Sequence, residues 1–276
     1  RHAYGTLNAL PDGWQVALDA RADVIDPARV LQLWPEAVGT KTRDWLSENL
    51  ISAKIKDADF ALRIAPGARP RVYLGMDYEE GSARFLKNLP PVTQARGHAS
   101  LDGTRLVVSL DEGVVEAGEG GAVKVERSAF IIPDITVKGG APAVVRLNAR
   151  GPVTAALWTL DQPPMAVMRR AGLPVTLGEG EAVASGTISF PLKRGSGGDV
   201  KFDVTADLLN LSTSRLIKGR TLKAAEMKVV ASTNSVEISG PGSLDGVPFE
   251  GRWQQPIGAG AADSTLRGTA QITPRA

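Results

Sequence analysis

The chain has 276 residues, 43% of them hydrophobic and 22% charged, a composition typical of folded globular proteins that excludes a disordered or fibrous chain. Its 32 Lys and Arg against 30 Asp and Glu leave a net charge of +2, so no concentrated positive field attracts nucleic acid. Cysteine is absent and only two histidines occur; we therefore expect no thiol chemistry, no metal centre and no cofactor. Glycine is abundant at 30 residues, while aromatic residues make up 5%.

The ends of the sequence and its longest apolar stretch bear on membrane targeting. The chain opens on Arg1 without the pattern of a signal peptide, which suggests a segment of a longer protein. The charge-free stretch 151–160 has about half of the roughly 20 residues that a membrane helix needs. We expect no membrane-spanning helix in this sequence.

Alternation of apolar and polar residues dominates the chain. Between 14 and 24 the even positions include Trp14, Val16 and Leu18, whereas the odd positions include Asp19. This two-residue period is typical of a strand with one buried face. Gly, Asp-Gly or Pro separates the alternating segments. We predict about a dozen or more strands, with cores near 14–24, 57–64, 105–111, 145–147, 188–190, 200–206, 229–231, 236–238, 247–253 and 266–272.

Helical signals are few. Asp26 followed by Pro27 predicts the start of a helix, because Asp caps a helix N-terminus and proline suits its first turn. Further short helices are predicted near 42–50, 82–89, 164–171 with Gly172 as the stop, and 212–218 with Gly219 as the stop.

One sequence pattern recurs. Ser-Leu-Asp-Gly occupies 100–103 and 243–246, and each copy predicts a hairpin with an Asp-Gly turn. No fixed period is visible, and a meander of hairpins reuses such turns in any case. We expect one continuous segment over 1–276, with sub-repeats near 1–160 and 161–276 as an open alternative.

The strand pattern predicts the architecture. A sheet with one apolar face must cover that face with a second sheet, helices or a ligand. Sandwich cores use bulky residues, whereas many inward positions here are Ala, Val or Gly. We therefore predict a mainly β fold, a long, curled antiparallel sheet that forms a trough with a few short helices. Its interior candidates, for which packing under a helix is as good an interpretation as lipid contact, are Trp14, Val16, Leu18, Phe60, Leu62, Ile64, Leu106, Val108, Leu110, Ile188, Phe190, Phe202, Val204, Phe249 and Trp253.

A series of short motifs carries a family resemblance. Residues 33–37 read LWPEA, 43–50 read RDWLSENL, and a strand follows at 56–64. Phe85-Leu86 and Leu89-Pro90-Pro91 then precede Gly97 and the Leu101-Asp102-Gly103 turn, and 248–253 read PFEGRW. In this order, the motifs resemble those of the AsmA-like, YhdP-type periplasmic bridge proteins of Gram-negative bacteria over 5–253.

The resemblance implies a function. Such proteins carry an inner-membrane helix and a long periplasmic β groove whose hydrophobic interior conducts phospholipid toward the outer membrane. For this chain it implies a periplasmic segment, tethered to the inner membrane through parts outside this sequence, that binds phospholipid or another acyl-chain lipid and is not an enzyme. A scaffold or assembly factor that contacts other envelope proteins is the alternative.

Candidate residues for other chemistry are weaker. The acid pairs Glu79-Glu80 and Asp111-Glu112 are interpreted as solvated charge in turns rather than as general acids and bases, as are Glu179 and Glu181. The glycine clusters at 118–121, 195–198 and 258–260 lack the Lys-Ser/Thr of a phosphate loop and favour hairpin tips. His98 is expected on a strand surface. Arg169-Arg170 and Lys193-Arg194 are expected in solvent, with lipid phosphate as the alternative partner.

Overall fold

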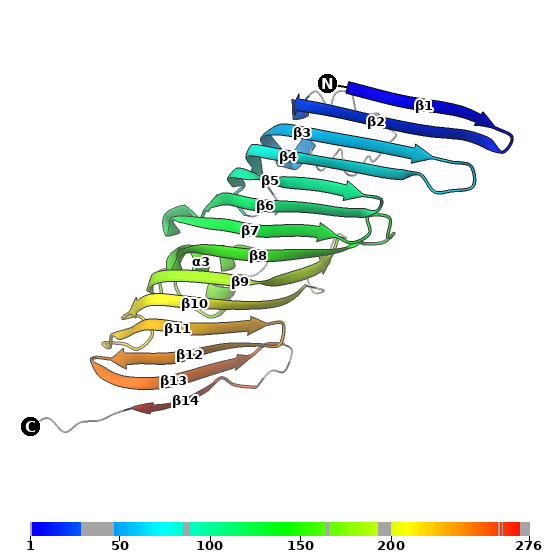
Figure 1. Cartoon of the computed structure of the whole chain (residues 1–276). Coiled ribbons are helices and arrows are strands. Elements are labelled where there is room, and N and C mark those ends of the chain that lie inside the picture. Colours follow the sequence, from blue (N-terminus) through cyan, green and yellow to red (C-terminus); the bar gives the residue numbers. More distant parts are fainter. Residues whose placement is uncertain are drawn as a thin grey trace, which may run out of the picture.

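The computed structural model describes residues 2–28, 47–84, 89–163, 166–192, 200–258, 260 and 262–270. Fourteen strands form one antiparallel sheet whose spatial order is the chain order. Figure 1 shows them stacked from the N-terminus to the C-terminus at the opposite end. The strands are β1 His2–Leu10, β2 Gly13–Ile25, β3 Leu50–Ile64, β4 Arg71–Ala83, β5 Val92–Asp102, β6 Arg105–Glu116, β7 Ala122–Ile132, β8 Pro142–Pro152, β9 Glu179–Pro191, β10 Lys201–Thr213, β11 Leu222–Ser232, β12 Ser235–Leu244, β13 Val247–Pro256 and β14 Thr265–Ala270.

This sheet confirms the predicted fold class, mainly β with one long, open antiparallel sheet. Every neighbouring pair of strands is sequential, so each connection returns the chain directly beside the preceding strand. Both Ser-Leu-Asp-Gly copies form the predicted hairpins, with Gly103 between β5 and β6 and Gly246 between β12 and β13. Both glycines have positive φ, 59° and 84°, which glycine adopts without a steric penalty. Fourteen strands at about 4.8 Å spacing make the sheet roughly 60 Å long.

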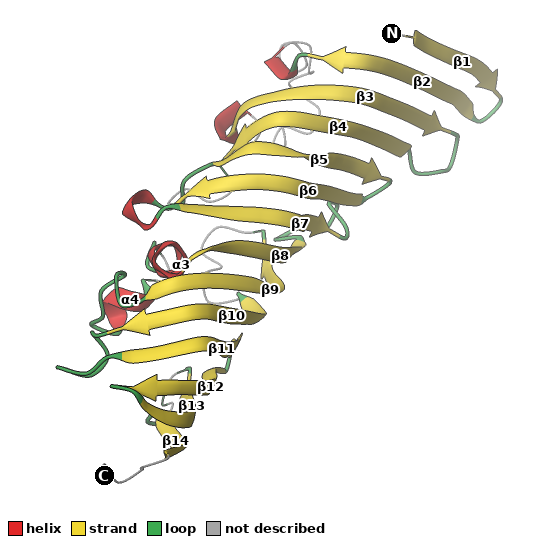
Figure 2. Cartoon of the chain, turned by 60° about the vertical axis from the view of Figure 1, so that its left-hand side comes forward, coloured by secondary structure: helices red, strands yellow, loops and turns green. Residues whose placement is uncertain are grey.

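The strands are bent rather than straight, as Figure 2 shows. Within the strands, five residues other than glycine take positive φ: Asp57, Glu80, Gln94, Arg127 and Asn210. The register shifts beside them, for instance between Lys56 and Asp59 in β3 and between Leu209 and Ser212 in β10. Such bulges insert a residue, bend the strand and increase its twist. Because these β-bulges recur in several strands, they curl the sheet.

The helices in the described part of the chain are short. They include η1 Gly118–Gly120, α3 Val153–Leu160 and α4 Val167–Arg170, and residues 27–28 and 47–49 are also helical. α4 matches part of the helix predicted at 164–171, and Gly172 ends it with φ +67°. The Asp26 cap is confirmed, since its Oδ1 accepts the backbone N–H of Ala28 at 2.9 Å. Much of the helix predicted at 42–50 lies outside the described residues.

One helix prediction is wrong, and another is wrong at its start. Residues 82–83 of the helix predicted at 82–89 belong to β4, where Ala83 pairs with both Leu50 and Val92; residues 85–88 lie outside the described part. Residues 212–213 belong to β10, and Thr213 pairs with Leu222 in β11. The remaining residues to 219 form bends and a turn. In both places, pairing with neighbouring strands outweighs local helix propensity.

Candidate functional site

The two faces of the sheet differ in chemistry. Residues directly opposite each other on adjacent strands point to the same side of a sheet, so the register assigns each side chain to a face. Across β3 to β10, one series of residues on the same face is apolar throughout, and each step joins direct partners except the step along β6 from Leu106 to Val108. The series runs through Phe60, Leu74, Leu101 and Leu106, then through Val108, Phe130, Val145, Ile188 and Phe202.

The apolar face continues to both edges of the sheet. Phe60 pairs with Ala20 of β2, and Ala20 with Ala3 of β1. Toward the other edge, Val229 of β11 pairs with Ile238, and the next partners are Trp253 and Leu266. All fourteen strands therefore contribute to one apolar surface, which we call the floor.

The register places all fifteen predicted interior residues on the floor. Leu18 pairs with Leu62, for example, and Val16 pairs with Ile64. Phe249 lies opposite Gly242 and Ala270. Contact of these side chains with lipid stays a prediction, whereas their common face is a property of the strand pairing.

Within the described ranges, no second layer buries the large side chains of the floor completely. Fourteen of the fifteen are half-buried, and Trp14 is 59% exposed. The buried hydrophobic residues among those described are mostly small, with alanine the commonest type, and no large side chain is fully buried. A half-exposed apolar surface of this length is unusual for a monomeric soluble protein and is typical of a binding surface.

Glycines on the floor indicate which way the sheet curls. A Cβ added at Gly97 would overlap the carbonyl oxygen of Ser109 in β6, and one at Gly186 would overlap that of Asp203 in β10. At Gly268 it would lie 2.7 Å from the carbonyl oxygen of Glu250. At these positions the backbone of the adjacent strand lies close to the floor side of the glycine, as expected on the concave face of a curled sheet. The excess of glycine has a structural role here, because only glycine fits where adjacent strands close in.

Tyr78 is a polar residue on the floor. It pairs with Gly97, and its hydroxyl donates to the carbonyl oxygen of Ser109 at 2.6 Å. Burial, reinforced by the negative charge of Asp111, raises the pKa of Tyr78 to about 12. The phenol therefore stays neutral at ordinary pH, and its ring covers the surface that Gly97 leaves bare.

Helix α3 covers part of the floor near one end of the strands. Val153, which is 5% exposed, packs with Ala182, Leu211 and Ala224, which line the floor on β9, β10 and β11. Ala156 and Leu157 pack against the same cluster. Figure 2 shows α3 and α4 at the same end of the strands. Sequence reasoning missed α3, and the only signal was the charge-free stretch 151–160.

The opposite face is polar and carries ion pairs between adjacent strands. Arg21 Nε lies 2.5 Å from Asp59 Oδ1, and Arg63 Nη2 lies 2.7 Å from Asp19 Oδ1. His98 Nδ1 lies 2.7 Å from Asp77 Oδ1, and this exposed position on β5 confirms the surface-strand interpretation. These pairs are exposed, so they stabilise the sheet only weakly, but they make this face hydrophilic.

The acid pairs lie within strands rather than in turns, which corrects the prediction. Glu79 and Glu80 lie in β4 and pair with Lys56 and Lys54, each at 2.5 Å. The hydrogen bond from Lys56 lowers the pKa of the Glu79 carboxyl. The carboxylate pairs are thus engaged with basic side chains, an arrangement that suits a solvated charged surface.

The remaining acids and bases follow the same pattern. Glu181 accepts two hydrogen bonds from Arg150, at 2.5 and 2.8 Å, and Arg150 lowers the pKa of Glu181. Arg169 pairs with Asp161 at 3.1 Å. Lys193 and Arg194 lie outside the described residues.

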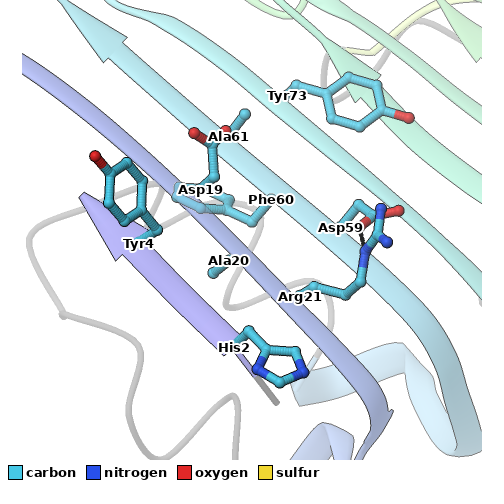
Figure 3. A pocket seen from close by; sticks show the side chains of 9 residues that line it. All are labelled: His2, Tyr4, Asp19, Ala20, Arg21, Asp59, Phe60, Ala61 and Tyr73. Carbon is cyan, nitrogen blue, oxygen red and sulfur yellow. Dashed lines mark hydrogen bonds and ion pairs between the residues drawn. The ribbon is translucent and has the colours of Figure 1, made fainter. Parts of the chain in front are cut away.

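A shallow depression of about 520 Å³ lies among β1 to β4. Figure 3 shows Tyr4 and Tyr73 at opposite sides of it, with Asp19 between them and Arg21 paired with Asp59. These side chains alternate with the floor residues and so belong to the polar face. The depression is broadly open, and two of its charged side chains, Arg21 and Asp59, pair with each other.

Two other kinds of site are absent from the described residues. Among them, no three His, Asp or Glu side chains come together as a metal site would require. No described helix is long and apolar enough to cross a bilayer.

Comparison of the chain with protein-family models, with curated proteins and with solved structures finds no match. The resemblance to AsmA-like proteins therefore rests on the sequence motifs. The physical argument for function rests on the floor itself.

Proposed function

We propose that this chain binds acyl-chain lipid along the floor and conducts phospholipid between the inner and outer membranes of a Gram-negative cell. The observation that carries the proposal is a half-exposed apolar surface that continues through all fourteen strands, with a charged surface on the other side of the same sheet. A surface about 60 Å long is twice the roughly 30 Å hydrocarbon thickness of a bilayer. It offers an acyl chain an apolar environment along its whole length.

The energetics favour transport along such a surface. Each methylene that leaves water contributes about 0.8 kcal/mol, so an acyl chain with about 14 buried methylenes avoids a cost on the order of 10 kcal/mol. Hydrophobic contact is non-directional. A lipid therefore slides along the floor without breaking a fixed set of hydrogen bonds, while its headgroup stays at the open side of the trough.

Localisation and partners follow from the family resemblance. We place the chain in the periplasm, tethered to the inner membrane by parts outside this sequence, as a lipid carrier rather than an enzyme. The ion pairs of the polar face, such as Arg150 with Glu181, suit contact with water. Phospholipid is the proposed ligand, and other envelope proteins are secondary partners.

Native mass spectrometry of the purified chain, mixed with a phospholipid extract, tests the proposal. We expect lipid adducts on the wild-type chain that are lost in Val204→Asp, which puts a charge on the floor. Thr205→Asp is the matched control, because Thr205 is the next residue and lies on the polar face opposite Val230. Absence of adducts on the wild type, or equal adducts on both variants, would contradict lipid binding by the floor.

A scaffold for envelope assembly is the second candidate. The observation in its favour is β1, whose nine residues are all exposed and which pairs with β2 along one edge only. β1 lacks Lys, Glu, Asp and Pro, the residues that usually protect a strand edge from pairing. Outer-membrane proteins that co-purify with a lipid-free chain would support this alternative.

A further inference from the structure

The connection between β8 and β9 is far longer than the sheet requires. Two antiparallel strands can be joined by two residues, and several hairpins here use such turns. Residues 153–178 instead insert α3 and α4 between Pro152 and Glu179, which begins β9. Pro152 and Glu181 are paired neighbours. The insertion therefore leaves the sheet and returns to it at nearly the same point.

The root of the insertion is fixed to the sheet by hydrogen bonds. Thr213 Oγ1, at the end of β10, donates to the carbonyl oxygen of Leu177 at 2.5 Å. Arg215 Nη1 donates to Thr176 Oγ1. These bonds hold residues 176 and 177 beside the ends of β9 and β10, whatever position α3 takes.

The turn between α3 and α4 is closed by its own polar groups. Asp161 Oδ1 accepts the backbone N–H of Arg169 at 2.8 Å, and Arg169 Nη2 donates to the carbonyl oxygen of Asp161 at 2.6 Å. The Asp161 side chain is only 13% exposed. The two short helices are therefore joined as one unit, and the bonds of this latch do not reach the sheet.

The contact between α3 and the floor is apolar. Val153, Ala156 and Leu157 provide it on the helix side, and Ala182 and Leu211 are among their floor partners. On another side the helix backbone rests against η1, where a Cβ at Gly120 would lie 2.7 Å from the Cα of Ala155. The floor beneath α3 is continuous with the rest of the apolar face. An acyl chain would therefore make the same kind of apolar contact with this surface as α3 does.

We propose that α3, residues 153–160, forms a lid that occupies the floor of β9 to β11 in the lipid-free protein and is displaced by an acyl chain. The proposal rests on the proposed lipid-binding function and deepens it by naming a competitor for the floor. Displacement breaks the hydrogen bond that Thr154 Oγ1 donates to the carbonyl oxygen of Gly178 at 3.3 Å, and otherwise exchanges one set of non-directional contacts for another. The bonds of residues 176 and 177 and the Asp161–Arg169 latch survive the exchange, so the lid moves as a unit about its root.

Hydrogen exchange of the whole chain, with and without palmitate, gives the first test. We expect amides of 153–160 to exchange faster when palmitate is bound, and amides of β10 and β11 to exchange more slowly or unchanged. Slower or unchanged exchange of α3 on palmitate binding would overturn the lid.

A pair of substitutions on one helix gives the second test. Leu157→Ala weakens the contact of α3 with the floor, so α3 covers the floor for a smaller fraction of the time. We therefore expect the apparent affinity for palmitate to rise roughly tenfold, because palmitate binds only where the floor is uncovered. Leu160→Ala is the matched control, since Leu160 is 43% exposed, and its affinity should equal that of the wild type. Circular dichroism of both variants checks that the sheet is intact.

The outcomes separate the lid from the lipid-binding function. If the wild type binds palmitate and Leu157→Ala binds it equally or more weakly, the lid proposal is wrong while lipid binding stands. If neither the wild type nor Leu157→Ala binds palmitate, lipid binding fails and the lid fails with it. If only Leu157→Ala binds, the lid keeps the wild-type floor closed and the proposal holds.

Discussion

Replacing Gly97 by alanine tests whether the sheet curls as the structure shows. A Cβ at Gly97 would overlap the carbonyl oxygen of Ser109 and would lie 2.8 Å from the hydroxyl oxygen of Tyr78. Backbone cannot rotate away as a side chain does, so β5 and β6 must separate. Overpacking of this kind costs about 1–3 kcal/mol, and loss of the hydrogen bond from Tyr78 to Ser109 adds about 1 kcal/mol.

We therefore expect Gly97→Ala to lower the free energy of unfolding by about 2–4 kcal/mol, which corresponds to roughly 5–15 °C in Tm for a chain of this size. Urea denaturation followed by far-UV circular dichroism measures it. Gly5→Ala is the control, because its added Cβ would meet the flexible end of Leu18 at 3.3 Å, and its stability should change by less than about 0.5 kcal/mol. If the two variants were equally stable, the close approach of β6 to Gly97, and with it the curvature argument, would be refuted.

Three further predictions concern the floor. Val204→Asp should abolish binding of a fluorescent fatty acid, measured by titration, whereas Thr205→Asp should leave the affinity within about twofold of the wild type, because only the first charge meets the acyl chain. Tyr78→Phe should remove a pH dependence of the free energy of unfolding. The raised pKa of Tyr78 stabilises the fold fully below pH 10, the ordinary pKa of tyrosine, and that stabilisation is lost as the pH rises toward about 12. Urea titrations from pH 8 to 12 measure it, and an equal change of unfolding free energy with pH in variant and wild type would contradict the assignment. Val153→Ala should lower the free energy of unfolding by about 1–2 kcal/mol in chemical denaturation, since Val153, the first residue of α3, is buried against the floor; an unchanged midpoint would mean that α3 does not pack there.

The strands and their inward faces could be predicted from the sequence because alternation is a local signal. Trp14, Val16 and Leu18 already define which side of β2 is apolar, and the pairing of Leu18 with Leu62 carries that side to β3. Hairpin connections limit the alternatives, since each Asp-Gly turn returns the chain beside the strand that it has just left.

The bends could not be predicted, because they fall on residues without a local signal. Glu80, Gln94 and Arg127 adopt positive φ inside strands, a conformation that these residue types rarely take and that pairing with neighbours imposes. The abundance of glycine is consistent with a bent sheet, but it does not predict that Gly97 and Gly186 lie on the floor.

α3 could not be predicted for a related reason. Its eight residues are uncharged, and only Thr154 and Thr159 are polar, so they show little amphipathic period. Conversely, residues 212–213 carried a helical signal but pair with β11. Contacts between elements, which local patterns do not contain, decide both cases.

Site-specific photo-crosslinking in Gram-negative cells tests the central claim most directly. A photoreactive residue at Val108 or Phe202, both on the floor, should yield phospholipid adducts, whereas the same residue at Asp203, adjacent to Phe202 on the polar face, should yield none. Absence of lipid adducts at both floor positions, or equal adducts at Asp203, would contradict the account.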